Sequence, residues 1–280
     1  MPPDSASPPL HERLGDPPWH YWIARVVPML YVTILTLMLP TILTQSFVVS
    51  DLGVNQDRRL QQHLRAISIK VLAHGEHIGS GVLLARQQQV YTAITNAHVI
   101  QATNAPFQLQ THDGQVYAAA LVTPPSGQNR DLSILRFQSH DRTYTTAKLA
   151  TASPRIGDRI WSAGFPSENG DPVEDRQSGA TKVNLGLHII NAQIVQILPI
   201  AIAGGYSIGF DGSIRKGMSG GPSIDRSGEL IGINGVHAHP LWNTPEMLEN
   251  GTIASEALQQ QINDYSWAIP IEFVKSYTRE

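Results

Sequence analysis

From residue 67 onward the chain is built of short β-like runs separated by turn residues, and no other feature constrains its fold more. In the first run Ile67, Ile69 and Val71 alternate with Ser68 and Lys70. A period of two is typical of a strand that is buried on one face.

Further runs of β-forming composition follow at close spacing. They cover residues 81–85, 90–95, 107–111, 116–123, 132–137, 158–165, 181–184, 188–195, 206–210, 229–234 and 266–269. Clusters of Gly, Pro, Asn and Asp separate them, so the sequence predicts an all-β sandwich or barrel. Helical periodicity is confined to residues 254–262 and 271–278.

Composition excludes several functional classes. The 280 residues, 41% hydrophobic and 15% charged, suit a folded chain of one or two domains. A net charge of −3 and a pI near 6.4 provide no basic surface, so we expect no nucleic-acid partner. Because the chain has no cysteine, a disulfide scaffold, a thiol nucleophile and a thiolate metal site are excluded.

The N-terminal part differs from the rest. Residues 1–25 are proline-rich and are expected to form a disordered tail. Residues 26–50 carry no charge and would form a helix about 37 Å long, enough to cross a hydrocarbon core of about 30 Å. A long preceding stretch and the lack of an A-x-A-like site favour a retained membrane anchor over a cleaved signal peptide or a buried soluble helix. Residues 51–65 are polar, and we expect a linker with a short helix.

The sequence K-G-M-S-G-G-P over residues 216–222 contains the strongest candidate nucleophile. Glycine allows main chain to approach a substrate closely, so this turn can present Ser219. The N–H groups of Gly217 and Ser219 can then converge on a developing oxyanion. The alternative is a flexible Gly/Ser turn without catalytic function. The presence of a base and an orienting acid elsewhere in the chain distinguishes the two interpretations.

Two further residues supply that base and acid. His98 ends the apolar run T-A-I-T-N-A-H-V-I, and Asp131 begins the run D-L-S-I-L-R-F. Each alone has an ordinary interpretation, as a core or surface histidine and as a turn residue. The order His98, Asp131, Ser219 is the order of chymotrypsin-like hydrolases.

With these segments the chain resembles the trypsin/chymotrypsin-like serine proteases, in particular the cysteine-free bacterial branch that includes the HtrA/Deg protease domains. The matching segments are G-S-G-V (79–82), T-N-A-H-V-I (95–100), D-L-S-I-L (131–135), I-G-D-R-I-W-S-A-G-F-P (156–166), G-M-S-G-G-P (217–222), G-E-L-I-G-I-N-G (228–235) and S-W-A-I-P (266–270). The resemblance implies a protease domain over residues 66–275. It would contain two six-stranded antiparallel β-barrels, about 66–150 and 151–275, and a short C-terminal helix.

The resemblance also implies the chemistry. Ser219 would be the nucleophile, His98 the general base and then acid, and Asp131 the residue that orients the imidazole. The N–H groups of Gly217 and Ser219 would form the oxyanion hole. The substrates would be polypeptides, and neither a cofactor nor a metal is implied. The protein would be a single-pass membrane endopeptidase whose protease domain faces the periplasm or an equivalent lumen, although flanking charge does not set the orientation.

The chain departs from its relatives in two places. Met218 stands where trypsin-type enzymes carry an aspartate that pairs with a new N-terminus, so we expect no zymogen activation of that type. The chain ends soon after the last expected strand, so we expect no PDZ domain, and no trimerisation or peptide sensing is assumed.

Specificity is left open by the sequence. If Ser213 forms the floor of the first specificity pocket, the pocket is uncharged and takes apolar or small side chains, which is the interpretation we favour. If Asp211 faces inward, Arg or Lys would be preferred. Asn234, Gly235 and His237 are expected to form the opposite wall. Gly235 would offer backbone for pairing with substrate, and His237 could bind an acidic side chain.

Three other interpretations fit parts of the same sequence. The G-x-S-x-G pattern also fits the nucleophile elbow of α/β-hydrolases, but that fold needs an acid and then a histidine after the serine. Only His237 and His239 follow Ser219, and Pro222 opposes a helix after the elbow. A metal pair at His237 and His239 has no further ligand at a recognisable spacing. A catalytically silent binding or chaperone-like module is disfavoured by the intact serine, histidine and aspartate.

Overall fold

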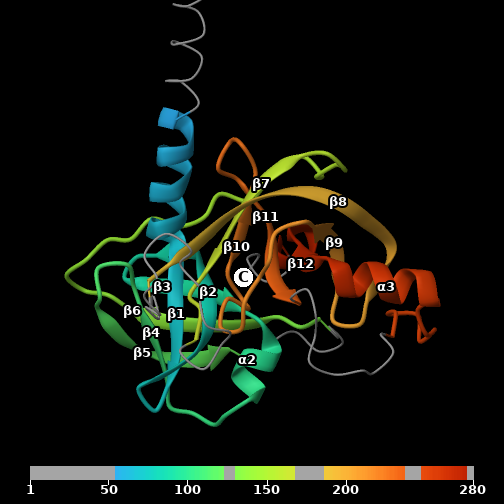
Figure 1. Ribbon diagram of the computed structural model, residues 1–280. Helices are drawn as coiled ribbons and strands as arrows, with labels where there is room; N and C mark the ends of the chain where they lie inside the picture. Colours follow the sequence, from blue (N-terminus) through green and yellow to red (C-terminus); the bar gives the residue numbers. More distant parts are fainter. Residues whose placement is uncertain (1–53, 123–129, 168–185, 237–246, 276–280) are drawn as a thin grey trace, which may run out of the picture. The chain divides into compact units, whose positions relative to one another are not determined.

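The computed structural model describes residues 54–122, 130–167, 186–236 and 247–275, and its internal contacts separate two units, Met1–Asp57 and Arg58–Glu280 (Figure 1). The expected tail (1–25) and membrane segment (26–50) therefore lie outside the described residues. Within the described ranges, no helix is both long enough and apolar enough to cross a bilayer. Residues 54–67 form a helix that leads directly into the first strand.

The first barrel consists of six antiparallel strands. They are β1 (Ser68–Ala73), β2 (Glu76–Gln87), β3 (Val90–Thr95), β4 (Phe107–Gln110), β5 (Val116–Val122) and β6 (Ser133–Gln138). The barrel closes in the order β1-β2-β3-β6-β5-β4. A short helix, α2 (Ala97–Gln101), lies on the path from β3 to β4.

The second barrel repeats this arrangement. Its strands are β7 (Arg159–Gly164), β8 (His188–Ile202), β9 (Tyr206–Phe210), β10 (Pro222–Ile224), β11 (Leu230–Val236) and β12 (Ser266–Pro270). They close in the order β10-β11-β12-β9-β8-β7. Helix α3 (Glu256–Asp264) precedes β12 and helix α4 (Ile271–Val274) follows it. Ser255 caps α3 by accepting a hydrogen bond from the N–H of Leu258.

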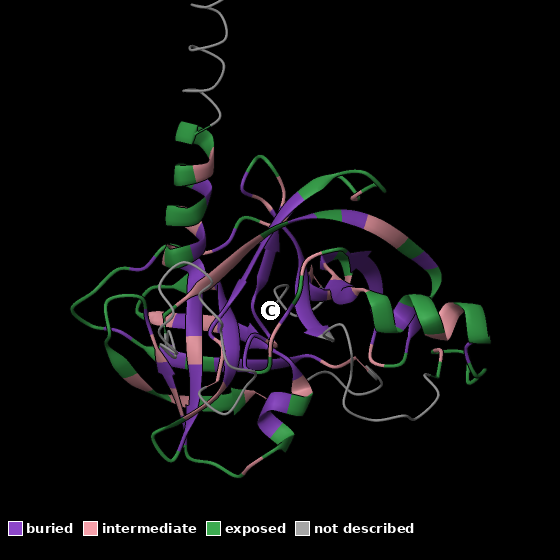
Figure 2. Ribbon diagram, viewed as in Figure 1, coloured by how far each residue is buried: buried purple, intermediate pink, exposed green. Residues whose placement is uncertain are grey.

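Strands β2 and β3 are buried on both faces, and this links the two barrels. Leu83 and Tyr91 belong to the core of the first barrel. Val82 and Ile94 point the other way, into a cluster that also contains Trp267 of the second barrel. Burying one such side chain stabilises a fold by about 1.5–3 kcal/mol. Figure 2 shows the resulting continuity of buried residues through the strands of both barrels.

The predicted architecture of two six-stranded antiparallel barrels is confirmed, while some elements were not expected. Strand β10 escaped prediction because it is short and begins with Pro222, which cannot donate a ladder hydrogen bond. Strand β8 continues to Ile202, beyond the expected end at residue 195. Helix α2 was also not expected. The strand expected at residues 181–184 lies outside the described part of the chain.

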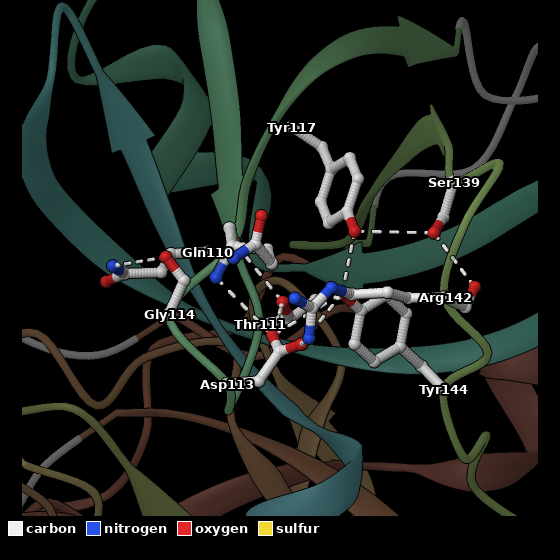
Figure 3. A network of polar contacts seen from close by, with 9 residues as sticks. Gln110, Thr111, Asp113, Gly114, Tyr117, Ser139, Arg142 and Tyr144 are labelled. Atoms are coloured by element: carbon white, nitrogen blue, oxygen red, sulfur yellow. Dashed lines mark hydrogen bonds and ion pairs between the residues drawn. The ribbon is translucent and has the colours of Figure 1, made fainter.

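A polar network ties the β4–β5 turn of the first barrel to the segment after β6 (Figure 3). The carboxylate of Asp113 accepts hydrogen bonds from Thr111 Oγ1 at 2.6 Å and from Tyr144 Oη at 3.2 Å. It also accepts from Arg142 Nη1 at 2.8 Å. The network extends to the hydroxyls of Tyr117 and Ser139.

Candidate active site

His98 and Asp131 are joined by two hydrogen bonds. Strand β3 ends at Thr95, and extended Asn96 turns the chain into helix α2. The N–H of His98, in the first turn of that helix, has no partner within the helix. It donates instead to Asp131 Oδ1 at 2.8 Å, while the His98 ring places Nδ1 2.6 Å from Asp131 Oδ2. The Asn96 amide donates to the main-chain carbonyl of Asp131 at 2.9 Å.

Asp131 is also held by the second barrel. Its N–H donates to Gly204 O at 2.9 Å, and the hydroxyl of Tyr206 donates a short hydrogen bond to its Oδ2. Burial acts to raise the pKa of Asp131, but the hydrogen bonds from His98 and Tyr206 outweigh it and hold this pKa below its usual value. Burial, followed by the charge of Asp131, raises the pKa of Tyr206 well above its usual value. The carboxylate is therefore ionised and the phenol protonated at neutral pH.

The ionised state of Asp131 determines which nitrogen of the His98 ring carries the proton. An ionised carboxylate can only accept hydrogen bonds, so the proton of the neutral His98 ring lies on Nδ1 and Nε2 remains an acceptor. The His98 side chain is 47% exposed, whereas that of Asp131 is 17% exposed. The pair therefore presents an acceptor nitrogen toward solvent from a largely buried carboxylate.

The serine loop, residues 216–222, contains two positions whose backbone conformation only glycine tolerates. Gly217 has φ of 91° and Gly220 has φ of 88°, both in the left-handed region. A Cβ at residue 217 would lie 2.5 Å from Ser167 N and 2.7 Å from Phe165 O, and one at residue 220 would overlap Ser80 O. Both glycines are therefore required by the backbone angle and by the close approach of neighbouring main chain.

Ser80 of strand β2 holds the serine loop across the two barrels. Its N–H donates to Ser219 O at 2.8 Å and its hydroxyl donates to Gly217 O at 2.7 Å. The Ser80 carbonyl accepts from Thr95 Oγ1 at 2.7 Å. Because Thr95 lies three residues before His98, this chain of contacts brings the histidine segment to the serine loop.

The loop leaves two backbone donors free. Lys216 O accepts a hydrogen bond from Ser167 N at 2.9 Å. In a trans peptide the carbonyl and the following N–H point in opposite directions, so the N–H of Gly217 points away from Ser167. In the described ranges neither the Gly217 nor the Ser219 N–H donates an intramolecular hydrogen bond. Gly217 is buried and Ser219 is half-buried, and unpaired main-chain donors in such surroundings are rare unless a ligand uses them.

The hydroxyl of Ser219 is hydrogen-bonded to main chain rather than to His98 in the described part of the chain. Its hydroxyl donates to Gly235 O at 3.2 Å. Both Ser219 and His98 belong to the described residues, and no hydrogen bond joins their side chains there. The candidate nucleophile and base are thus brought to one place but are not yet engaged with each other.

Ser213 and Asp211, two of the residues expected at the specificity pocket, lie in the described part of the chain. Ser213 is exposed. Asp211, at the start of the β9–β10 connection, is also exposed, and its Oδ1 accepts a hydrogen bond from Gln193 N of strand β8 at 2.7 Å. His237 lies outside the described residues.

Asn234 is fully buried in a structural network of side chains. Its Oδ1 accepts from Ser162 Oγ at 2.7 Å and from Ser223 Oγ at 2.6 Å, and its amide donates to Ala163 O at 3.1 Å. Its main chain is bonded to Gly220 and Gly221 of the serine loop, and its amide also donates to Pro222 O at 3.4 Å, at the end of that loop.

Two contributors were missed from the sequence. Ser80 stood inside the matching segment G-S-G-V, but nothing showed that its hydroxyl would bind the serine loop. Tyr206 opens an ordinary β-like run and carried no signal. Both act on residues far away in the sequence, which no local pattern reveals.

Comparisons with known proteins agree with this geometry. Residues 79–233 match the family described as Trypsin-like peptidase domain. The chain is 30% identical over 158 residues to a probable periplasmic serine endoprotease DegP-like of Buchnera aphidicola subsp. Schizaphis graminum, covering 56% of this chain and 29% of that protein. It is 30% identical over 157 residues to the serine endoprotease DegS of Escherichia coli K12, covering 56% of this chain and 39% of that protein.

The solved structure of the serine endoprotease from Yersinia pestis has the same fold. It superimposes with a TM-score of 0.52 and 21% identity, over 77% of this chain and 64% of that chain. The curated relatives are much longer than the part that this chain matches. The family match covers more than half of the chain and agrees with the two-barrel fold, so the chain belongs to the trypsin-like peptidase family and is homologous to the DegP and DegS serine endoproteases.

Proposed function

We propose that this chain is a serine endopeptidase in which Ser219, His98 and Asp131 form the catalytic triad. The observation that carries the proposal is the pair of hydrogen bonds between Asp131 and His98, which leaves Nε2 of the imidazole as an acceptor. A serine hydroxyl is a weak nucleophile until a neighbouring base removes its proton. His98 is the base that can do so here.

The reaction begins when Ser219 leaves its hydrogen bond with Gly235 O and turns toward Nε2 of His98. As Oγ attacks the substrate carbonyl carbon, its proton passes to Nε2, and the carbonyl oxygen becomes an oxyanion. Asp131 stabilises the imidazolium by accepting a hydrogen bond from its Nδ1–H group. His98 then returns the proton to the leaving amine, and water hydrolyses the acyl-enzyme by the same steps.

The free N–H groups of Gly217 and Ser219 are proposed to bind the oxyanion. Preorganised donors of this kind act only where charge develops, and removing one costs about 10²–10³ in rate. Ser80 supports this role, because its hydroxyl fixes the carbonyl of Gly217 and hence the orientation of the loop.

The location and the substrate class are proposed from the sequence and from the names of relatives. We propose that residues 26–50 anchor the chain in a membrane and that the protease domain faces the periplasm or an equivalent lumen. The DegP-like relative is named as periplasmic. The substrates are proposed to be polypeptides with an apolar or small side chain before the scissile bond, since Ser213 is uncharged and one oxygen of Asp211 is bound to the main chain of strand β8. A reporter fused after Glu280 should be active only outside the cytoplasm, and cytoplasmic activity would overturn the orientation.

One observation favours a second candidate, a peptide-binding module without catalysis. Ser219 is bonded to Gly235 O rather than to His98, as in a resting site. Loose contacts between nucleophile and base are nevertheless common in enzymes without substrate. A silent module would bind unfolded polypeptide without cleaving it.

Hydrolysis of unfolded casein by the full detergent-solubilised chain separates the two candidates. We expect Ser219→Ala to abolish casein hydrolysis, because loss of the nucleophile lowers kcat of comparable serine enzymes by about a millionfold. Ser153→Ala, at an exposed serine outside the constellation, serves as the matched control. Cleavage that survives in Ser219→Ala, or binding without any cleavage by the wild-type chain, would reject the enzymatic proposal.

A further inference from the structure

Tyr206 is a buried residue of the second barrel that binds the acid of the first. It is 3% exposed, and its hydroxyl donates to Oδ2 of Asp131, the same oxygen that accepts from His98 Nδ1. The other oxygen, Oδ1, accepts from the His98 main chain. With three donors in place, the carboxylate has one orientation in which all of them are satisfied.

The space for the Tyr206 hydroxyl is created by Gly235. A Cβ at residue 235 would overlap the Tyr206 hydroxyl and lie 2.5 Å from its Cζ atom. The backbone of Gly235 is outside the left-handed region, so its conformation would accept other residues. The absence of a side chain at residue 235 is therefore explained by the phenol ring that fills its place.

Gly204 completes the enclosure. Its carbonyl accepts the N–H of Asp131 at 2.9 Å. A Cβ there would lie 3.0 Å from the Cβ of Asp131 and 3.2 Å from Cε2 of Tyr206. Gly204 and Tyr206 of the second barrel thus contact the aspartate of the first, Gly235 makes room for the tyrosine, and none of the three belongs to the serine loop.

We propose that Tyr206, seated in the space left by Gly235, is a positioning residue that fixes the Asp131 carboxylate against His98. This inference rests on the proposed function, because the orientation of Asp131 matters for turnover only if His98 acts as a base. Gly235 has a second role in the arrangement, since its carbonyl accepts the hydroxyl of Ser219. Gly235 therefore contacts both Tyr206, which binds the acid, and Ser219, the proposed nucleophile.

The decisive variant is Tyr206→Phe, which removes one hydroxyl and keeps the ring that fills the space beside Gly235. Loss of a group that orients a catalytic residue costs about ten- to hundredfold in rate. We expect kcat on a peptide substrate to fall by about that factor with little change in KM. We also expect the low-field proton resonance of the His98 Nδ1–H, recorded on the full detergent-solubilised chain, to shift or broaden.

Tyr117→Phe is the matched control. It removes a phenol hydroxyl that is hydrogen-bonded to Tyr144 Oη at 2.7 Å, in a network of the first barrel that contains none of the proposed catalytic residues (Figure 3). We expect it to change neither kcat nor the low-field resonance. A Tyr206→Phe variant with wild-type kcat and an unchanged resonance would overturn the proposal.

The steric part of the proposal is tested by thermal unfolding. Gly235→Ala should lower the melting temperature strongly when Tyr206 is present. It should lower it much less in a chain that also carries Tyr206→Leu, because leucine is shorter than tyrosine. Additive effects of the two substitutions would mean that the glycine is not there to accommodate the phenol.

These readouts keep the two proposals distinguishable. If the wild-type chain and Ser219→Ala cleave casein equally, the proposed function fails, while the resonance and the unfolding measurements still decide whether Tyr206 positions Asp131. If Ser219→Ala is inactive and Tyr206→Phe is fully active, only the positioning role fails.

Discussion

Among the residues that the structure describes, two aspartates are hydrogen-bonded to a tyrosine, and one of them, Asp131, lies in the candidate active site. Asp113 of the first barrel accepts from Tyr144, and Asp131 accepts from Tyr206. In both pairs burial acts to raise the pKa of the carboxyl, and hydrogen bonds outweigh it, so each pKa lies below its usual value. In both pairs burial comes first among the effects that raise the pKa of the phenol.

The pairs differ in their third member. Arg142, the partner of Asp113, has a guanidinium group with donors only, so it offers no acceptor for a substrate proton. His98, the partner of Asp131, has a second ring nitrogen that can accept a hydrogen bond, and its side chain is 47% exposed. The same aspartate–tyrosine pair is thus a structural tie beside arginine and a potential proton-transfer site beside an exposed histidine.

The largest effect that would sharpen this comparison comes from exchanging each carboxylate for an amide. Asp131→Asn should lower kcat by about 10⁴, because an amide no longer holds the useful tautomer of the imidazole. Asp113→Asn should leave kcat unchanged and lower the free energy of unfolding by about 1–3 kcal/mol through its lost charged hydrogen bonds. Steady-state kinetics and denaturant unfolding measure both. A loss below tenfold in Asp131→Asn would point to a different orienting acid.

A smaller effect is expected at the serine that links the barrels. Ser80→Ala removes the hydroxyl that donates to Gly217 O and accepts from Phe165 N. We expect kcat to fall by about 10–10²-fold as the serine loop loses its fixed orientation. Ser139→Ala, in the network of Asp113, should be silent in kinetics. Equal activities of the two variants would show that the loop keeps its conformation without Ser80.

Acid should destabilise both pairs. A carboxyl whose folded pKa is depressed adds stability above its unfolded pKa of about 3.9, and this stability is lost as pH falls through the folded pKa. The free energy of unfolding should therefore decrease below about pH 4, and less steeply in Asp113→Asn and Asp131→Asn than in the wild-type chain. Denaturant unfolding from pH 7 to pH 3 measures the slopes. Parallel curves for the wild-type chain and either variant would contradict the assignment for that aspartate.

The smallest effect is expected at the cation of the structural pair. Arg142 is half-exposed, and ion pairs of this kind contribute about 0–1 kcal/mol. Arg142→Gln should lower the free energy of unfolding by no more than that and leave kcat unchanged. A kinetic effect of this substitution would show that the network of the first barrel communicates with the candidate active site.

Most of the fold was predictable because its evidence is local. Alternation around Ile69, the turn clusters and the helical pattern near Glu256 each involve neighbouring residues, and the corresponding elements are present. Strand β10 was not predictable, since its few residues are held by pairing with β7 and β11 rather than by their own propensity. The expected catalytic residues were identified by motif and order, and the structure brings His98 and Asp131 together.

What the sequence alone determined is therefore an all-β fold and the identity of the candidate serine, histidine and aspartate, with the two-barrel architecture implied by the family resemblance. Only the tertiary structure decided what holds them. Tyr206 reaches Asp131 across 75 positions and Ser80 reaches Gly217 across 137, while Asn234 lies in a buried network instead of facing substrate through its side chain. The contacts of Tyr206 and Ser80 arise where one barrel packs on the other, and the network of Asn234 joins strands β7, β10 and β11 of the second barrel. No periodicity or motif within a strand encodes which residues will meet in such places.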